Sequence, residues 1–257
     1  MRVVSLTCSN TEIVCALGCG GLLVGVDNYS DYPAAELAGL PRVGKDLDID
    51  VDAVAALQPD LVLASLTVPG HERVVAGVEA AGLPFLAPDP TSIRDVYRDI
   101  RSIAAHLDCV VRGEALIAAM QQALTPSVPV ETPSPPRICV EWWPKPVIVP
   151  GRQSWVTEMI EIAGGCNPFG DRNETSVTVA PGEAAPIDAV VISWCGVELA
   201  NYRPAQVLER AGWEQVPAVV EKRVFPISEA FLGRPGPRLV DGVAALRRVV
   251  AACRPQV

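Results

Sequence analysis

Aromatic and arginine side chains gather where strands are expected to end and loops to begin, and they are the strongest candidates for binding chemistry. Aromatic residues make up only 5% of the chain, so this grouping is informative. Indole and phenol rings offer flat apolar faces to a ligand, and guanidinium groups donate charge-assisted hydrogen bonds. The predicted ligand contacts are Tyr29, Trp142, Trp143, Arg152, Trp155, Trp194, Phe231 and Arg234.

Each of these side chains also has a structural interpretation. Trp142 and Trp194 would serve equally well as core residues of a sheet, and Tyr32 precedes a proline, which favours a structural role. For Arg238 we favour a loop-bracing ion pair, whereas we expect Arg234 to reach the ligand. The sequence leaves core and ligand roles equally open for any single aromatic residue.

The sequence offers little support for catalysis or metal binding. The two histidines, His71 and His106, are too few for a three-histidine zinc site and do not combine with a nucleophile and an acid into a triad. We therefore predict no catalytic residues, no metal ligands and no cofactor. An enzyme that uses Glu141 or Asp171 as acid or base beside the tryptophans is the alternative hypothesis.

Composition narrows the class of protein. Apolar residues make up 49% of the 257 residues and charged residues 20%, as expected of a folded globular chain. The net charge of -9 opposes binding to nucleic acid phosphates. Prolines, glycines or charges interrupt every apolar run before the ~20 residues that cross a bilayer, so no membrane span is predicted.

The first residues and the cysteines bear on the compartment. Met1 to Leu6 begins directly as a strand, whereas a secretory leader needs a basic segment, an apolar stretch and a cleavage site. Most of the eight cysteines lie in apolar contexts, as thiols do in a reducing compartment. We expect a cytoplasmic protein. The alternative is an extracytoplasmic protein whose leader has been removed.

Strand and helix signals alternate in the first half of the chain. A β-rich run at Arg2 to Leu6 precedes Ser9-x-x-Glu12, a spacing typical of a capping box that opens a helix. The alternation predicts a parallel sheet covered on both faces. The further expected elements are strands at Leu22 to Val26, Leu61 to Ala64 and Pro84 to Ala87, and helices at Asp52 to Leu57 and Glu72 to Ala81.

The second half repeats this order after a long helical segment and a proline cluster. The predicted architecture is α/β, with two three-layer lobes that have central, mostly parallel sheets and are joined by one long backbone helix. The expected strands are Arg137 to Trp142, Ala189 to Trp194 and Arg223 to Ile227, and the helices are Trp155 to Ala163, Pro204 to Ala211 and Arg238 to Cys253. The predicted domains are an N-terminal lobe at 1–92, the connecting backbone helix at 93–125, a proline-rich linker at 126–136 and a C-terminal lobe at 137–257.

Four motifs in order along the chain carry a family resemblance. Together they resemble the vitamin B12 (cobalamin)-binding proteins of ABC importers, within the helical-backbone, class III periplasmic-binding-protein superfamily. No single motif would suffice, but the set covers nearly the whole chain. The motifs are Val24-Gly25-Val26-x-x-Tyr29-Ser30-Asp31-Tyr32-Pro33, Leu57-Gln58-Pro59-Asp60-Leu61-Val62, Glu158-x-x-x-x-Ala163-Gly164-Gly165 and Gly233-Arg234-Pro235-Gly236-Pro237-Arg238.

The resemblance implies a non-catalytic, monomeric binding protein that holds a corrinoid or similarly large organic ligand in a cleft between its lobes. It also implies an ABC permease as partner, docked by one acidic residue on each lobe. Asp52 matches the first position, and Glu183 is the carboxylate nearest to the second. Around Gly44-Lys45 and Ser65-Leu66 the chain lacks the family's aromatic residues. Two functions stay open: a cytoplasmic corrinoid binder, and a secreted importer component for cobalamin, siderophore or haem.

Overall fold

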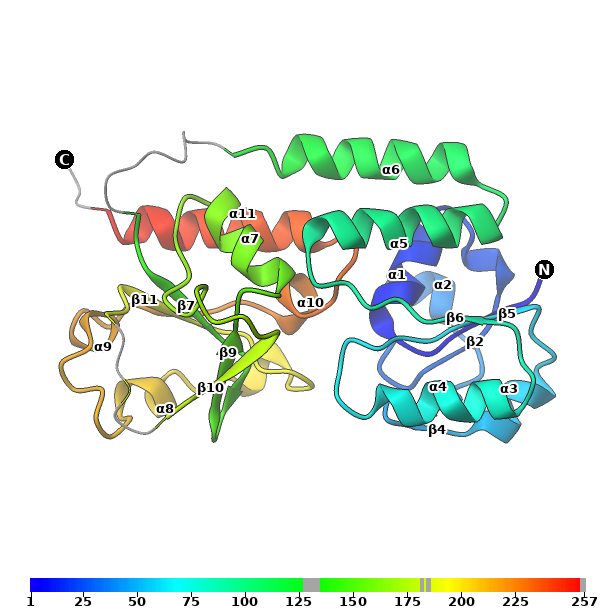
Figure 1. Ribbon diagram of the computed structural model, residues 1–257, viewed down its shortest axis with the longest axis horizontal. Coiled ribbons are helices and arrows are strands. Elements are labelled where there is room, and N and C mark those ends of the chain that lie inside the picture. The colour runs from blue at the N-terminus through cyan, green and yellow to red at the C-terminus, as the bar shows by residue number, and fades with distance from the viewer. Residues whose placement is uncertain (127–134, 181–182, 184–185, 255–257) are drawn as a thin grey trace. The chain divides into compact units, whose positions relative to one another are not determined.

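The computed structural model describes residues 1–126, 135–180, 183 and 186–254 (Figure 1). The chain divides into two compact units. The first comprises Met1–Pro90 and Arg94–Met120, and the second comprises Thr91–Ile93 and Gln121–Val257. Each unit has its own parallel sheet with helices, so the prediction of a two-lobed α/β fold is confirmed.

The first unit is built on a four-stranded parallel sheet with the order β2-β1-β5-β6. The central strand β1 pairs with β2 on one side and with β5 on the other. All residues of β1 and β5 are buried, as expected of parallel strands that are covered on both faces. The strands are β1 (Val3–Ser5), β2 (Leu23–Val26), β5 (Leu61–Leu63) and β6 (Phe85–Leu86).

The helices of the first unit follow the predicted pattern, with one correction at the first helix. Helix α1 begins at Cys8 after Thr7, so Ser9 and Glu12 lie inside the helix and are buried. The predicted capping box is wrong, because the chain turns into the helix only two residues after β1 ends. The further elements are α1 (Cys8–Ala16), η1 (Gly20–Leu22), α2 (Ala34–Leu37), β3 (Gly44–Lys45), β4 (Asp48–Ile49), α3 (Val51–Ala56) and α4 (His71–Ala80).

The segment predicted as one continuous backbone helix is instead two helices, α5 (Ile93–His106) and α6 (Val110–Ala123). The break falls at Asp108, whose φ of 52° lies in the left-handed region that ends a helix. The two helices form an antiparallel hairpin (Figure 1), across which Arg101 donates two hydrogen bonds to Glu114 at 2.7 and 3.1 Å. The predicted apolar face of α5 is buried against the rest of the unit.

The second unit contains a parallel sheet with the order β12-β11-β7 and an antiparallel sheet with the order β10-β9-β8. The sequence did not predict the antiparallel sheet, because prolines stand within or beside its strands. The strands are β7 (Ile138–Glu141), β8 (Trp143–Pro144), β9 (Val147–Pro150), β10 (Ser176–Val179), β11 (Ala189–Ile192) and β12 (Val224–Pro226). The helices are α7 (Trp155–Ile162), η2 (Leu199–Asn201), α8 (Ala205–Leu208), α9 (Pro217–Val220), α10 (Glu229–Leu232) and α11 (Leu239–Ala252).

The proline-rich linker predicted at 126–136 lies mostly outside the described residues, which omit 127–134. The exact domain boundaries given by the sequence stay predictions. Among the helices of the described residues, none has the length and apolar character needed to cross a membrane.

The close approach of α5 and α6 generates a stability prediction. A Cβ atom at Gly113 would lie 2.6 Å from the Cβ of Ala104, so Gly113→Ala forces the helices apart. Although alanine is the better helix former, we expect a loss of about 1–3 kcal/mol in the free energy of unfolding, measured with urea. Gly21→Ala is the control, since its Cβ meets nothing within 4 Å. If Gly113→Ala changes the free energy of unfolding no more than Gly21→Ala does, or raises it, the described packing of α5 against α6 is contradicted.

Candidate functional site

Parallel strands bring their carboxyl ends to one edge of a sheet, and ligands of open α/β sheets bind outside that edge. We call this edge the carboxyl edge of each unit. In the first unit it includes the loop Asp27–Ser30 after β2. In the second unit it includes Trp142 after β7, Trp194 just beyond β11 and the α10 segment after β12. Six of the eight predicted ligand contacts follow these strand ends: Tyr29, Trp142, Trp143, Trp194, Phe231 and Arg234.

A buried network of hydroxyl groups holds the loop after β2. Thr11 Oγ1 lies 2.8 Å from Ser5 Oγ and 2.8 Å from Ser30 Oγ, and Ser30 Oγ donates to a carboxylate oxygen of Asp27. The other Asp27 oxygen accepts a hydrogen bond from the backbone N–H of Tyr29 at 2.8 Å. The network fixes the backbone of Tyr29, whose side chain is 46% exposed.

The Asp27 side chain, which accepts hydrogen bonds from this loop, is completely buried. Burial raises the pKa of its carboxyl group, while the donors from Ser30 and Tyr29 act in the opposite direction. Arg42 donates to the backbone carbonyls of Asp27 and Ser30 at 2.9 and 2.6 Å. The sequence analysis missed this network, although polar residues within apolar elements were the available signal.

Two of the predicted contacts in the second unit are held within its core. The indole N–H of Trp155 donates to the carbonyl of Leu232 at 2.7 Å, and the Trp155 side chain is 7% exposed. The indole N–H of Trp194 donates to Glu141 at 3.0 Å, and Trp194 is 4% exposed. These contacts favour the structural interpretation for both indoles. Their contact with a ligand stays a prediction.

Glu141 and Arg210 form a buried ion pair beneath this edge. The Glu141 side chain is completely buried, and its Oε2 lies 2.7 Å from Arg210 Nη1. The Arg210 guanidinium also stacks over the ring of Trp213, with 4.4 Å to the ring centroid. Both carboxylate oxygens of Glu141 are thus engaged, by Arg210 and by Trp194. Glu141 is not accessible as the acid or base that the enzyme hypothesis requires.

Other predicted contacts reach the surface of the second unit. Trp143 is 41% exposed, and its indole N–H donates to the carbonyl of Lys145 at 3.1 Å, which fixes the ring on the β8–β9 hairpin. Trp142 is half-buried, with its ring 6.5 Å from that of Trp155. Arg152 is exposed.

The α10 segment contributes two further predicted contacts. Phe231 is half-buried, and the guanidinium of Arg238 lies 5.4 Å from its ring centroid. Arg234, which we expected to face a ligand, has its Nε 3.5 Å from a carboxylate oxygen of Glu229. A loop-bracing ion pair is therefore present at Arg234, and the one expected at Arg238 stays a prediction.

The two predicted docking carboxylates differ in their surroundings. Asp52 is exposed in the first turn of α3. Glu183 pairs with Arg172 and accepts a hydrogen bond from the backbone N–H of Ala180 at 3.0 Å. Only Asp52 therefore has the exposure of a docking group.

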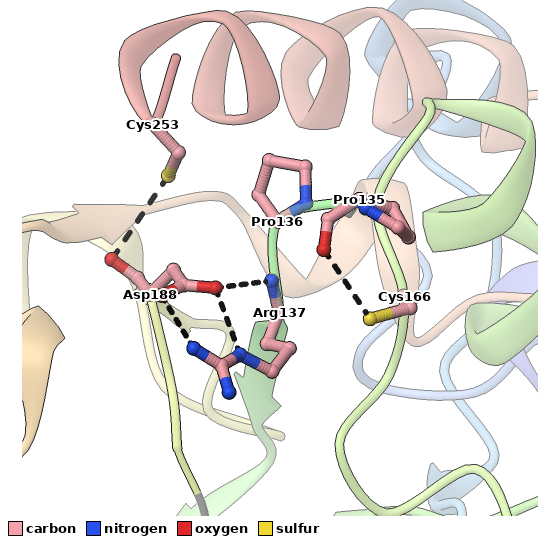
Figure 2. A pocket seen from close by; sticks show the side chains of 6 residues that line it. All are labelled: Pro135, Pro136, Arg137, Cys166, Asp188 and Cys253. Carbon is pink, nitrogen blue, oxygen red and sulfur yellow. Dashed lines mark hydrogen bonds and ion pairs between the residues drawn. The ribbon is translucent and has the colours of Figure 1, made fainter. Parts of the chain in front are cut away.

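A pocket of about 420 Å³ lies at the opposite edge of the second unit (Figure 2). Arg137 and Asp188 precede β7 and β11, and the guanidinium donates to both Asp188 oxygens at 3.0 and 3.1 Å. Because this pocket stands at the amino ends of the strands and its charges pair with each other, we assign it no ligand. It is lined by Pro135, Pro136, Arg137, Cys166, Asp188 and Cys253.

Comparison with known proteins decides the family. Residues 3–230 match the model described as periplasmic binding protein. The chain belongs to this family. The resemblance inferred from the motifs is therefore confirmed.

The names of several proteins similar to this periplasmic binding protein describe binding proteins. This chain is 27% identical to an uncharacterized ABC transporter substrate-binding lipoprotein, YvrC, of Bacillus subtilis, over 95% of this chain and 78% of that protein. It is 26% identical to a vitamin B12-binding protein of Vibrio parahaemolyticus, over 94% and 86% of the two chains. The haem-binding protein RhuT of Roseiflexus sp. RS-1 matches with a TM-score of 0.79, 28% identity and 98% coverage of both chains. This chain is therefore a binding protein rather than an enzyme.

The buried ion pair of this periplasmic binding protein generates a second stability prediction. Arg210→Met leaves the Glu141 carboxylate buried without its cation, so we expect a loss of about 3–5 kcal/mol in the free energy of unfolding. Arg101→Met is the control, because Arg101 and Glu114 form an exposed pair with water available to both. Equal effects of the two substitutions in urea unfolding would contradict the assigned burial.

The Arg137–Asp188 pair predicts a dependence of stability on pH. Hydrogen bonds from Arg137 hold the pKa of Asp188 below its ordinary value. The pair therefore contributes stability above the unfolded-state pKa of about 4, and this contribution is lost as the pH falls through the lower folded-state pKa. We expect Asp188→Asn to destabilise the protein at neutral pH, and by progressively less as the pH is lowered below about 4. Urea unfolding across this pH range measures the difference, and a difference that does not change with pH would contradict the prediction.

Proposed function

We propose that this chain is the substrate-binding component of an ABC importer and that it binds a large, flat tetrapyrrole, either a corrinoid or a haem. Membership of the periplasmic binding protein family supports the transport role. The names of two relatives, one vitamin B12-binding and one haem-binding, support this ligand class. Corrin and porphyrin rings share an extended face that aromatic side chains can cover.

The observation that carries the ligand class is that the carboxyl edge of each unit exposes a predicted aromatic contact, Tyr29 in the first unit and Trp143 in the second. Tyr29 stands on the loop held by Asp27 and Ser30, and Trp143 is fixed by its hydrogen bond to Lys145. A ring that is already held in place, as that of Trp143 is, loses little conformational entropy when a ligand stacks on it. Tyr29 and Trp143 are therefore the proposed stacking residues.

Polar groups of the second unit would orient the ligand. Arg152 is exposed and can donate to a carboxylate or an amide oxygen. The indole N–H of Trp142 has no acceptor among the described residues, so a ligand oxygen or a water would satisfy it. We propose Phe231 and Arg234 as further contacts, with Trp155 and Trp194 supporting the surface from within the core.

We propose an extracytoplasmic location, which the sequence analysis held as its alternative. The description of one relative as a substrate-binding lipoprotein supports it, as does the description of the haem-binding protein RhuT as periplasmic. A permease is the proposed partner, with Asp52 as one docking group. The displaced Glu183 is the weaker candidate, because it already pairs with Arg172.

Equilibrium titration tests the proposed ligand class. Cobalamin and haemin are each added to the protein while tryptophan fluorescence is followed, and we expect one of them to bind at 1:1. Tyr29→Ala and Trp143→Ala should each weaken that binding about 10-fold, as loss of a stacking anchor does. Tyr32→Ala is the matched control, because Tyr32 is 49% exposed in the same unit but was predicted to be structural.

The result also separates the two tetrapyrroles. For haem, the phenol of Tyr29 is a possible iron ligand, so Tyr29→Phe should change the visible spectrum of the bound iron. For a corrinoid, Tyr29→Phe keeps the ring and should leave the affinity nearly unchanged. The proposal fails if neither compound binds, or if Tyr32→Ala weakens binding as much as Tyr29→Ala.

A further inference from the structure

Two buried thiols face each other in the first unit. The Sγ atoms of Cys19 and Cys109 are 3.7 Å apart, although the residues are separated by 90 positions. The side chains are only 4% and 6% exposed. We propose that Cys19 and Cys109 are a disulfide-forming pair that fastens the end of α1 to the α5–α6 hairpin.

Helix ends hold both cysteines in place. The backbone N–H of Cys19 donates to Val14 at 3.0 Å, just after α1, and that of Cys109 donates to Ala104 at 2.8 Å, just after α5. Bond formation brings the sulfurs to about 2.05 Å, and small side-chain rotations and shifts at these two helix ends supply the approach. These backbone hydrogen bonds therefore hold the two sulfurs close to each other while no disulfide joins them.

One guanidinium group stands beside the two sulfurs. Arg112 Nη2 lies 3.3 Å from Cys19 Sγ, and Nη1 of the same guanidinium donates to the Gly18 carbonyl at 3.1 Å. Positive charge beside a sulfur is the setting in which cysteines react as thiolates. Burial raises the pKa of Cys109, while the same guanidinium acts in the opposite direction. Arg112 is therefore a neighbour of both sulfurs of the pair.

The oxidant is a disulfide, either of a small thiol or of a thiol oxidoreductase. Cys19 loses its proton and attacks one oxidant sulfur, which forms a mixed disulfide and releases the first oxidant thiol. Cys109 then loses its proton and attacks the Cys19 sulfur, which forms the Cys19–Cys109 bond and releases the second thiol. Two electrons and two protons pass to the oxidant in total. Because the exchange takes place during folding, the oxidant reaches both thiols before they are buried.

Peptide mapping of the full chain tests the pair. The protein is refolded in a redox buffer of reduced and oxidised glutathione, free thiols are alkylated, and trypsin is added. Cleavage after arginine gives a peptide of residues 3–42 and one of residues 102–112, and we expect them to be joined. The first peptide also contains Cys8 and Cys15, so single substitutions must identify the sulfur involved.

The substitution series gives opposite expectations for neighbouring thiols. Cys19→Ser should abolish the joined peptides, whereas Cys15→Ser should retain them, because burial and the neighbouring Glu36 carboxylate raise the pKa of Cys15 to about 12. Reduction should lower the Tm of the natural sequence by several degrees and leave that of Cys109→Ser unchanged, because the bond closes a long loop.

Free, alkylated Cys19 and Cys109 in folded protein from the oxidising buffer would overturn the proposal. Joined peptides that persist in Cys19→Ser would overturn it as well. Circular dichroism of each variant establishes that it is folded. The outcome is independent of ligand binding, since a chain that binds no tetrapyrrole can still form or lack this bond.

Discussion

Parallel pairing around one central strand in each unit is the constraint on which the rest of the structure depends. β1 pairs with both β2 and β5, and β11 pairs with both β7 and β12. Such a strand must be covered on both faces, which explains why all of its residues are buried. Parallel pairing also brings the carboxyl ends of the strands to one edge of the sheet, so the loops that follow the strands lie at that edge.

The carboxyl edge of each unit is held in place by buried polar groups that bond to one another beneath it. In the first unit the Ser30 hydroxyl donates to the Asp27 carboxylate, and the Thr11 hydroxyl links Ser30 to Ser5. In the second unit Glu141 is shared by Arg210 and Trp194. Buried charges of this kind are tolerated when they are paired and hydrogen-bonded, and they fix the loops above them. The proposed stacking residues Tyr29 and Trp143 are exposed, whereas Trp155 and Trp194 are buried in the core.

The sequence predicted the parallel strands and most helices well, because continuous apolar runs and 3.6-residue periodicity depend on local residues. It predicted one helix across 93–125, since neither glycine nor proline marks the break at Asp108. It did not predict the β8–β9 hairpin, because prolines stand within and beside its strands. Whether an indole is core or surface was not predictable, because Trp155 and Trp194 are buried by partners, Leu232 and Glu141, that lie 77 and 53 positions away.

Hydrogen exchange with and without a bound tetrapyrrole tests the account most directly. We predict ligand-dependent protection of the carboxyl-edge segments 27–30 and 142–146, and no change around Arg137 and Asp188 at the amino ends of the strands. Protection at those amino ends, with the carboxyl edges unchanged, would contradict the assignment of the binding surface.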